Sequence, residues 1–252
     1  MKVCYGIDNL RPCGASVVTV GSFDGVHRGH RVLIDALKTK ARELDAEAVV
    51  VTFGNHPRGG RDGFCILSTV EEKLLLLEDC GVDRVVVLPF DQKLRDLSAV
   101  DFVEQVLCGA LGAVHVIVGY DHRFGRGKEG DVVLLEECGR RFGFGVTEIG
   151  RQMADGLSVN STEVRAAIGR GDVELAARLL GHPYVVCGEW QNGTVVLPDM
   201  RKLLPPRGIY PIKINQGTTV TEGVANIAYS VICIVTKGSV ADGESVQVMF
   251  GC

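Results

Sequence analysis

Residues 17–33 read VVTVGSFDGVHRGHRVL, and this stretch predicts the unit that starts the fold. The β-branched run 17–20 is typical of a buried strand, and the strand is expected to stop at Gly21. An apolar-periodic segment then begins at Val32 and indicates a helix. The stretch therefore predicts a buried strand, a tight turn and the start of a helix.

The turn within this stretch has the composition of an anion-binding loop. A turn between a strand and a helix presents backbone N–H groups and a helix N-terminus at the carboxyl end of the strand, where an anion is favoured. Gly21, Gly25 and Gly29 allow the backbone to approach a bulky ligand, and His27 and His30 can both face that space. The alternative is a glycine-rich surface loop whose two histidines bind nothing.

The same alternation of strand and helix continues along the chain. Ser68 and Glu71 form a capping-box pattern before a Leu-rich helix, and the last helix is expected to end at Gly181. A pattern of five strands alternating with helices over residues 16–181 predicts a doubly wound parallel α/β sheet with right-handed crossovers. The four further strands are expected at residues 48–53, 84–88, 114–118 and 145–149.

The pattern changes after Pro183, where helical periodicity disappears. Short β-prone runs between turns predict a small antiparallel β-barrel-like unit there. We therefore expect two domains, at residues 1–183 and 184–252. The β-prone runs lie at residues 194–197, 208–214, 224–234 and 245–250.

Composition restricts the class of protein. The 252 residues are 46% hydrophobic and 23% charged, which is ordinary for a globular protein, and the net charge of −4 argues against a nucleic-acid binder that relies on a global positive field. No apolar run reaches the length of a membrane span. The nine cysteines form no CxxC pair. We therefore expect most of them to be small buried hydrophobic side chains, in a protein of the reducing cytoplasm. We expect small-molecule partners, with no nucleic acid or membrane, and leave open a homo-oligomer.

Histidines and cations gather where the predicted strands end. Ligands of open α/β sheets bind beyond those ends, and Arg165 follows two hydroxyl residues, Ser161 and Thr162, at a predicted helix start. Prepositioned cations and N–H donors of this kind suit a polyphosphate. The strand-end residues are His27, Arg28, His30, His56, Arg58, Arg61, His122, Arg123, Arg126 and Lys128.

Other interpretations of these residues remain open at this stage. Any single arginine can be a solvated surface residue, and Asp24, His27, His30, His56 and Asp121 could instead ligate a transition metal. His115 within a strand, His182 beside Pro183 and Trp190 are expected to have structural roles. The chain contains no Walker loop, no GxGxxG at the first turn and no GxSxG.

The segment Gly21-Ser22-Phe23-Asp24-Gly25-Val26-His27-Arg28-Gly29-His30 resembles the GxFDGVHxGH motif of the bacterial bifunctional riboflavin kinase/FAD synthetases, within the HxGH nucleotidyltransferase superfamily. The resemblance covers about residues 16–184, and further motifs agree in order and spacing. These are Thr52-Phe53 with His56-Pro57, Glu72-Lys73, Gly81-Val82-Asp83, Leu88-Pro89-Phe90, Gly119-x-Asp121-x-Arg123-Phe124-Gly125, Gly143-Phe144 and Ser161-Thr162-x-x-Arg165.

The resemblance implies transfer of AMP from ATP to FMN, giving FAD and pyrophosphate. It implies that His27 and His30 contact the ATP phosphates, and that Ser161, Thr162 and Arg165 hold the outgoing phosphates. It also implies Mg²⁺ on the phosphates, held mostly by water and substrate oxygens, so that no protein metal ligand is expected. The remaining implied binding residues are Gly21, Phe23, Asp24 and Gly29 for ATP, Gly119, Asp121, Arg123 and Phe124 for its ribose and adenine, and the loop 55–62, with Asn55, His56 and Arg58, for FMN.

Two departures from the family pattern bear on function. Asn160 stands where the family usually has a serine, but asparagine also caps helices, so we expect at most a modest effect. The Pro-Thr-Ala-Asn motif of the flavokinase module is missing after Gly188, although residues 203–210 and 223–227 resemble pieces of that barrel. We expect a shrunken flavokinase barrel without kinase activity. The alternatives are a bifunctional enzyme, a nucleotidyltransferase with another phosphate acceptor, and a flavin or nucleotide sensor with an inactive site.

Overall fold

The computed structural model describes residues 1–7, 14–59, 63–154, 156–228, 231–236 and 238–252. The chain divides into two compact units, each with its own hydrophobic core. The first unit contains residues 1–23, 29–58 and 74–151, and the second contains residues 24–28, 59–73 and 152–252.

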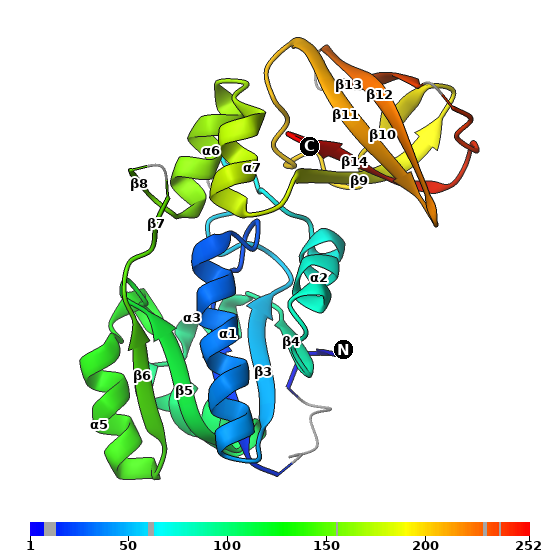
Figure 1. The fold of residues 1–252 in the computed structure, drawn as a ribbon. Coiled ribbons are helices and arrows are strands. Elements are labelled where there is room, and N and C mark those ends of the chain that lie inside the picture. Colours follow the sequence, from blue (N-terminus) through cyan, green and yellow to red (C-terminus); the bar gives the residue numbers. More distant parts are fainter. Residues whose placement is uncertain (8–13, 60–62, 155, 229–230, 237) are drawn as a thin grey trace. The chain divides into compact units, whose positions relative to one another are not determined.

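The first unit is built on a six-stranded parallel sheet, which confirms the predicted fold class (Figure 1). The strand order β1-β4-β3-β2-β5-β6 places β2, the strand that precedes the glycine-rich turn, near the centre. Every residue of β2 and β4 is buried, as expected for strands covered on both faces. The strands are β1 (Lys2–Tyr5), β2 (Ser16–Val20), β3 (Glu47–Phe53), β4 (Arg84–Leu88), β5 (Ala113–Gly119) and β6 (Gly145–Ile149).

The sheet contains one strand that the sequence pattern did not predict. Strand β1 pairs with β4 at the edge of the sheet, in the register Val3↔Val85. Three of its four residues are exposed and Cys4 is half-buried, so the strand lacks the apolar run by which the buried strands were recognised. The side chains of this edge strand are mostly exposed, so the strand needs no continuous apolar run.

The helices connect the strands of the sheet. Helix α1 begins at Arg28, four residues before the predicted start at Val32, because its polar first turn shows no apolar periodicity. Its buried face consists of Leu33, Ile34, Leu37 and Ala41. The elements are α1 (Arg28–Glu43), α2 (Val70–Asp79), α3 (Gln92–Asp96), α4 (Ala99–Asp101), the π-helix η1 (Phe102–Ala110), the 3₁₀ turn η2 (Arg126–Lys128) and α5 (Val132–Phe142).

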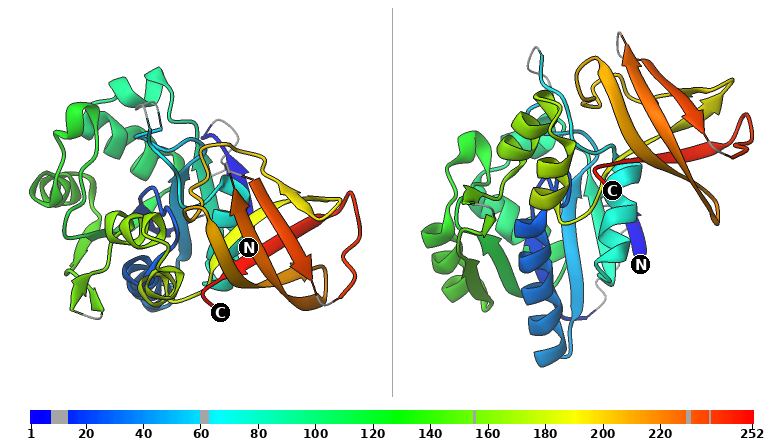
Figure 2. Two further views of the ribbon diagram at one scale, coloured as in Figure 1. Left: turned by 90° about the horizontal axis from the view of Figure 1, so that it is seen from above. Right: turned by 45° about the horizontal axis from the view of Figure 1, so that its top comes forward.

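The second unit contains a closed barrel, which confirms the antiparallel β unit expected from the sequence (Figures 1 and 2). The strand order around the barrel is β10-β13-β12-β11-β14-β9. Helices α6 (Ser161–Gly169) and α7 (Val173–Leu180) and the short strands β7 (Met153–Ala154) and β8 (Leu157–Ser158) precede it. The barrel strands are β9 (Tyr184–Gln191), β10 (Thr194–Val196), β11 (Gly208–Gln216), β12 (Thr219–Ala228), β13 (Val231–Thr236) and β14 (Ser245–Phe250).

Two details of the barrel differ from the prediction. Strand β9 was missed, and the single run expected at 224–234 belongs to two antiparallel strands, β12 and β13. That run contains no glycine or proline, the residues that most strongly mark a turn, so its division into two strands was not predicted. The apolar residues on alternate positions of these strands are nevertheless buried, as in β13, where Ile232 and Ile234 are buried.

One core joins the inside of the barrel to α6 and α7. Val186, Trp190 and Phe250 from the barrel belong to the same cluster as Ile168 and Leu179 from the helices. Trp190 is buried in this cluster, which confirms its expected packing role. None of the helices within the described ranges combines the length and the apolar character that a membrane-crossing segment requires.

Replacing Phe250 by alanine should lower the free energy of unfolding of the second unit by about 3–5 kcal/mol, because it leaves a cavity in a fully buried position of the barrel. Urea unfolding followed by circular dichroism measures the change. Val235→Ala is the matched control, since Val235 is 76% exposed on a strand of the same barrel and should change stability by less than about 0.5 kcal/mol. Equal effects of the two substitutions on the free energy of unfolding would contradict the assignment of Phe250 to the barrel core.

Candidate active site

The glycine-rich turn after β2 has an unusual backbone conformation. Phe23 and Val26 both have positive φ angles, of 46° and 39°, which side-chain-bearing residues rarely adopt. Gly25 lies between them at φ 80°, and a Cβ atom on it would lie 3.1 Å from Leu67 Cδ1. Backbone strain of this kind is typical of functional sites, where the surrounding structure holds it in place.

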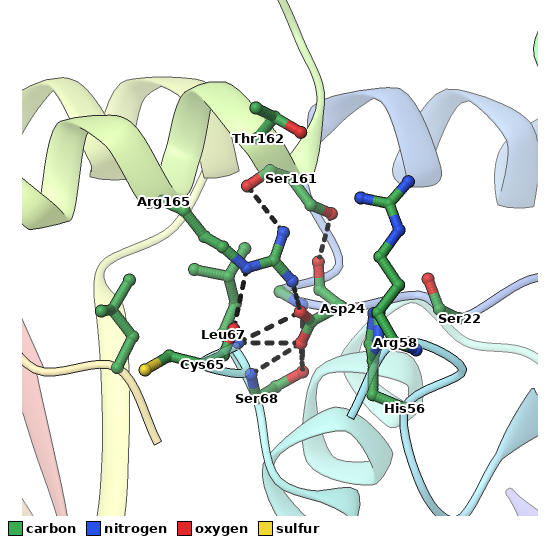
Figure 3. Close-up of polar contacts among 12 residues, drawn as sticks. Ser22, Asp24, His56, Arg58, Cys65, Leu67, Ser68, Ser161, Thr162 and Arg165 are labelled. Atoms are coloured by element: carbon green, nitrogen blue, oxygen red, sulfur yellow. Dashed lines mark hydrogen bonds and ion pairs between the residues drawn. The ribbon is translucent and has the colours of Figure 1, made fainter. Parts of the chain in front are cut away.

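The carboxylate of Asp24 is completely buried and bound by protein donors. The Leu67 N–H donates to it at 3.0 Å, and the Ser68 N–H and hydroxyl donate at 2.9 and 3.2 Å. Arg165 forms an ion pair with the same carboxylate (Figure 3). A buried charge is costly unless it is paired and hydrogen-bonded, and Asp24 meets both conditions.

The guanidinium of Arg165 is held in one orientation at the start of α6. Its Nε donates to the Cys65 carbonyl oxygen at 2.9 Å, and its Nη1 donates to the Ser161 carbonyl oxygen at 3.1 Å (Figure 3). Its third contact is the ion pair with Asp24, and its carbon Cζ lies 4.7 Å from the centroid of the Phe64 ring. The side chain is therefore fixed by contacts on several sides.

The N-terminus of α6 is capped by Asn160, as predicted. Its side-chain oxygen accepts hydrogen bonds from the N–H groups of Thr162 and Glu163, both at 2.9 Å. The Ser161 hydroxyl donates to the Asp24 carbonyl oxygen at 3.0 Å, whereas Thr162 is exposed. The asparagine thus makes the cap bonds that a serine would make.

His27 lies directly before α1 and is buried, with 7% of its surface exposed. Burial lowers the pKa of His27 from 6.5 to about 4, although the negative charge of Asp24 opposes the shift. The imidazole is therefore neutral near pH 7.

His182, expected to be structural, lies with its Nε2 3.1 Å from the Gly25 carbonyl oxygen and its Nδ1 2.8 Å from that of Pro183.

The remaining predicted site residues lie in the first unit. The His30 ring packs against Phe23, with centroids 4.9 Å apart. The Asn55 amide makes two hydrogen bonds with the backbone of Phe90, at 2.7 and 3.1 Å, so it holds together the loops that follow β3 and β4. His56 accepts from the Arg58 N–H at 3.0 Å. Residues 60–62 of this loop, including the predicted cation Arg61, lie outside the described residues.

The loop after β5 carries the other predicted binding residues. Arg123 forms an exposed ion pair with Asp131 at 2.8 Å, and Phe124 stacks on the His122 ring with centroids 5.6 Å apart. Burial lowers the pKa of His122 to about 4. Gly119 ends β5 and Asp121 is exposed two residues later. In the strand itself, His115 bonds Thr147 Oγ1 at 2.8 Å, consistent with the structural role expected of it.

Sequence reasoning missed two of the residues that hold Asp24, Leu67 and Ser68. Ser68 was expected to cap α2 with Glu71, but the capping box is formed one residue later by Thr69 and Glu72. The Ser68 hydroxyl instead donates to Asp24 and accepts from the Gly25 N–H at 3.0 Å. The local pattern fits both registers, so only the long-range contact with Asp24 distinguishes them.

Comparison with known proteins agrees with the motif series. Residues 11–163 match the family model described as FAD synthetase. The bifunctional riboflavin kinase/FMN adenylyltransferase of Escherichia coli K12 is 35% identical over 243 residues, which cover 90% of this chain and 78% of that protein. The chain belongs to the FAD synthetase family. The Pseudomonas fluorescens protein of the same name is 36% identical over 244 residues, covering 90% of this chain and 77% of the relative.

A solved structure supports the fold of this FAD synthetase-family chain. The crystal structure titled as a macrolide-efflux protein from Streptococcus pneumoniae superposes with a TM-score of 0.87, covering 100% of this chain and 90% of the other. The two sequences are 24% identical, so the match concerns the fold alone. Family membership makes the chain an enzyme of the nucleotidyltransferase class.

The geometry does not support the alternative interpretation of these residues as a metal centre. Among the residues that the structure describes, no three or more His, Cys, Asp or Glu side chains are placed to hold a metal ion. Asp24, one of the residues considered for that role, is instead bound by Arg165 and by backbone N–H groups.

Replacing Asn160 by alanine should lower the free energy of unfolding of the second unit by about 1 kcal/mol, because two N–H groups of α6 lose their acceptor. Asn160→Ser should cost much less, since serine caps helices equally well. Urea unfolding of both variants beside the wild type measures the difference. A serine variant as unstable as the alanine variant would show that the cap is not what Asn160 contributes.

The depressed pKa of His27 should make stability depend on pH. Between pH 6.5 and about 4 the unfolded chain binds a proton on His27 that the folded chain does not, so the contribution of His27 is fully present above pH 6.5 and is lost as pH falls. From pH 7 to pH 5 the free energy of unfolding of the wild type should fall by about 2 kcal/mol more than that of His27→Gln. Urea unfolding at both pH values measures this, and parallel pH dependences would contradict the burial of the imidazole.

Proposed function

We propose that this protein is an FAD synthetase that transfers AMP from ATP to FMN, giving FAD and pyrophosphate. The observation that carries the proposal is Arg165, whose guanidinium is fixed by Asp24 and by the Ser161 and Cys65 carbonyl oxygens at the N-terminus of α6. A rigid cation beside a helix N-terminus is a favourable environment for phosphate groups. Family membership supplies the reaction class.

In the proposed reaction, a phosphate oxygen of FMN attacks the α-phosphorus of ATP and pyrophosphate leaves. His27 and His30 contact the ATP phosphates, and His27, being neutral, acts as a hydrogen-bond donor rather than as a cation. Ser161, Thr162 and Arg165 stabilise the charge on the outgoing phosphates. Positioning and electrostatics suffice for such a transfer, so no covalent enzyme intermediate is invoked.

The substrates would be bound by the loops that follow the sheet strands. Gly21, Phe23, Asp24 and Gly29 shape the turn that receives ATP. Because Asp24 is buried, we assign it to the support of this turn rather than to direct contact with the nucleotide. Gly119, Asp121, Arg123 and Phe124 would meet the ribose and adenine, and the loop with Asn55, His56 and Arg58 would hold FMN.

Mg²⁺ would enter as part of the substrate, bound by phosphate oxygens and water. The proposal assigns adenylyl transfer to residues 1–183 and places the reaction in the cytoplasm, with ATP and FMN as the partners.

We further propose that residues 184–252 form a flavokinase-like barrel that has lost kinase activity, because the chain lacks the Pro-Thr-Ala-Asn motif after Gly188. The alternative is a bifunctional enzyme that also phosphorylates riboflavin.

The test is to incubate the protein with FMN, ATP and Mg²⁺ and to measure FAD by chromatography. The wild type should form FAD, and His30→Ala should lower kcat by roughly a hundredfold or more, because it removes a donor to the transferring phosphates. His115→Gln is the matched control, since His115 lies within β5 and bonds Thr147. It should retain near-wild-type turnover.

A folded His30→Ala protein with unchanged turnover would overturn the role assigned to His30, and a wild type that forms no FAD would overturn the proposed acceptor. A parallel assay with riboflavin and ATP should give no FMN. Formation of FMN there would favour the bifunctional alternative.

A further inference from the structure

Residues 65–68 form a short segment before α2, which we call the strap, that is bonded on two sides. On one side, the Cys65 carbonyl oxygen accepts from Arg165, and the Leu67 and Ser68 N–H groups donate to Asp24. These are the contacts that fix the Arg165 guanidinium and the carboxylate beside it (Figure 3). The strap therefore supplies part of the support for the proposed phosphate site.

On its other side, the strap is bonded to the segment that joins β10 to β11 of the barrel. The Ile66 N–H donates to the Arg201 carbonyl oxygen at 2.9 Å, and the Leu203 N–H donates to the Ile66 carbonyl oxygen at 2.9 Å. Between these two bonds, the ammonium group of Lys202 donates to the Leu67 carbonyl oxygen at 2.5 Å. Leu67 is thus held by Lys202 through its carbonyl group and by Asp24 through its N–H group.

Lys202 is itself locked in place. It is 4% exposed, and it donates to Glu72 Oε2 at 2.6 Å and to the Val185 carbonyl oxygen at 2.7 Å. Its ammonium lies 4.4 Å from the centroid of the Tyr184 ring. Glu72 is also fully engaged, because Oε2 accepts from the Thr69 N–H and Oε1 accepts from the Cys187 N–H at 2.7 Å. An ammonium with three acceptors and a buried counter-ion has little freedom to move.

We propose that Lys202, although it belongs to the barrel region, is a positioning residue for adenylyl transfer, acting through the strap on Asp24 and Arg165. The inference rests on the proposed function, because it takes Arg165 as a phosphate ligand. It gives the barrel region a role in FAD synthesis that is independent of any kinase activity. A displacement of about 1 Å in a catalytic cation is enough to slow a reaction by up to about a hundredfold.

The first test replaces Lys202 by methionine, which keeps the length of the side chain and removes its donors. Lys202→Met should lower kcat for FAD formation by roughly tenfold to a hundredfold. It should also raise the inhibition constant of pyrophosphate, the leaving product, and leave the KM for FMN within about twofold. Lys213→Met is the matched control, because Lys213 is an exposed lysine of strand β11, and it should behave as wild type.

The second test distinguishes positioning from a general loss of stability. If Lys202 acts through Arg165, the Lys202→Met substitution should lower kcat in the wild type but have almost no further effect in an Arg165→Ala background. An equal fold-loss in both backgrounds would overturn the proposal, as would a folded Lys202→Met protein with wild-type kcat and pyrophosphate inhibition.

Because Lys202→Met leaves Glu72 buried without its counter-ion, the single variant can fail to fold. The double variant Glu72→Gln/Lys202→Met removes both charges and keeps one of the two acceptor oxygens of residue 72. The same kinetic criteria apply to it. Binding of inorganic pyrophosphate, measured by calorimetry, needs no knowledge of the acceptor substrate. If the double variant binds pyrophosphate more weakly than the wild type, the positioning role of Lys202 is supported even if FMN is not the acceptor. Unchanged binding overturns that role.

Discussion

The buried carboxylate of Asp24 is the interaction on which the proposed phosphate site depends. Removing a carboxylate from water costs several kcal/mol, and the protein offsets this cost with N–H donors from Leu67 and Ser68 and with the Arg165 guanidinium. Each of these partners is fixed in return. The strained turn before α1, the strap and the N-terminus of α6 therefore share one anchor within the second unit.

This arrangement explains why the characteristic FDGVH segment contains an acidic residue in a loop that is proposed to receive phosphates. An exposed aspartate there would repel the substrate, since like charges raise the energy of binding in a low-dielectric site. Buried and neutralised by Arg165, Asp24 orients a cation instead. His27, held neutral by burial, adds a donor without adding a second buried positive charge beside Arg165.

Much of the fold followed from local patterns. The buried strands were recognised from continuous apolar runs, and the cap of α6 was recognised from Asn160 and the hydroxyl residues after it. The errors occurred where local signals are weak or ambiguous. Strand β1 is exposed at an edge, the run shared by β12 and β13 contains no glycine or proline, and two adjacent registers fitted the capping box of α2.

From sequence alone, the family, the parallel sheet followed by a β unit, and most of the residues proposed to act on phosphates could be inferred, because these depend on motifs and periodicities of a few residues. The pairing of Asp24 with Arg165 spans 141 residues, and that of Lys202 with Glu72 spans 130. No periodicity specifies such a pair, since each of these charged side chains could equally well lie on the surface in contact with water. The supporting position of Asp24 and the link from Lys202 to the site follow from folding, which buries each of these charges beside its partner.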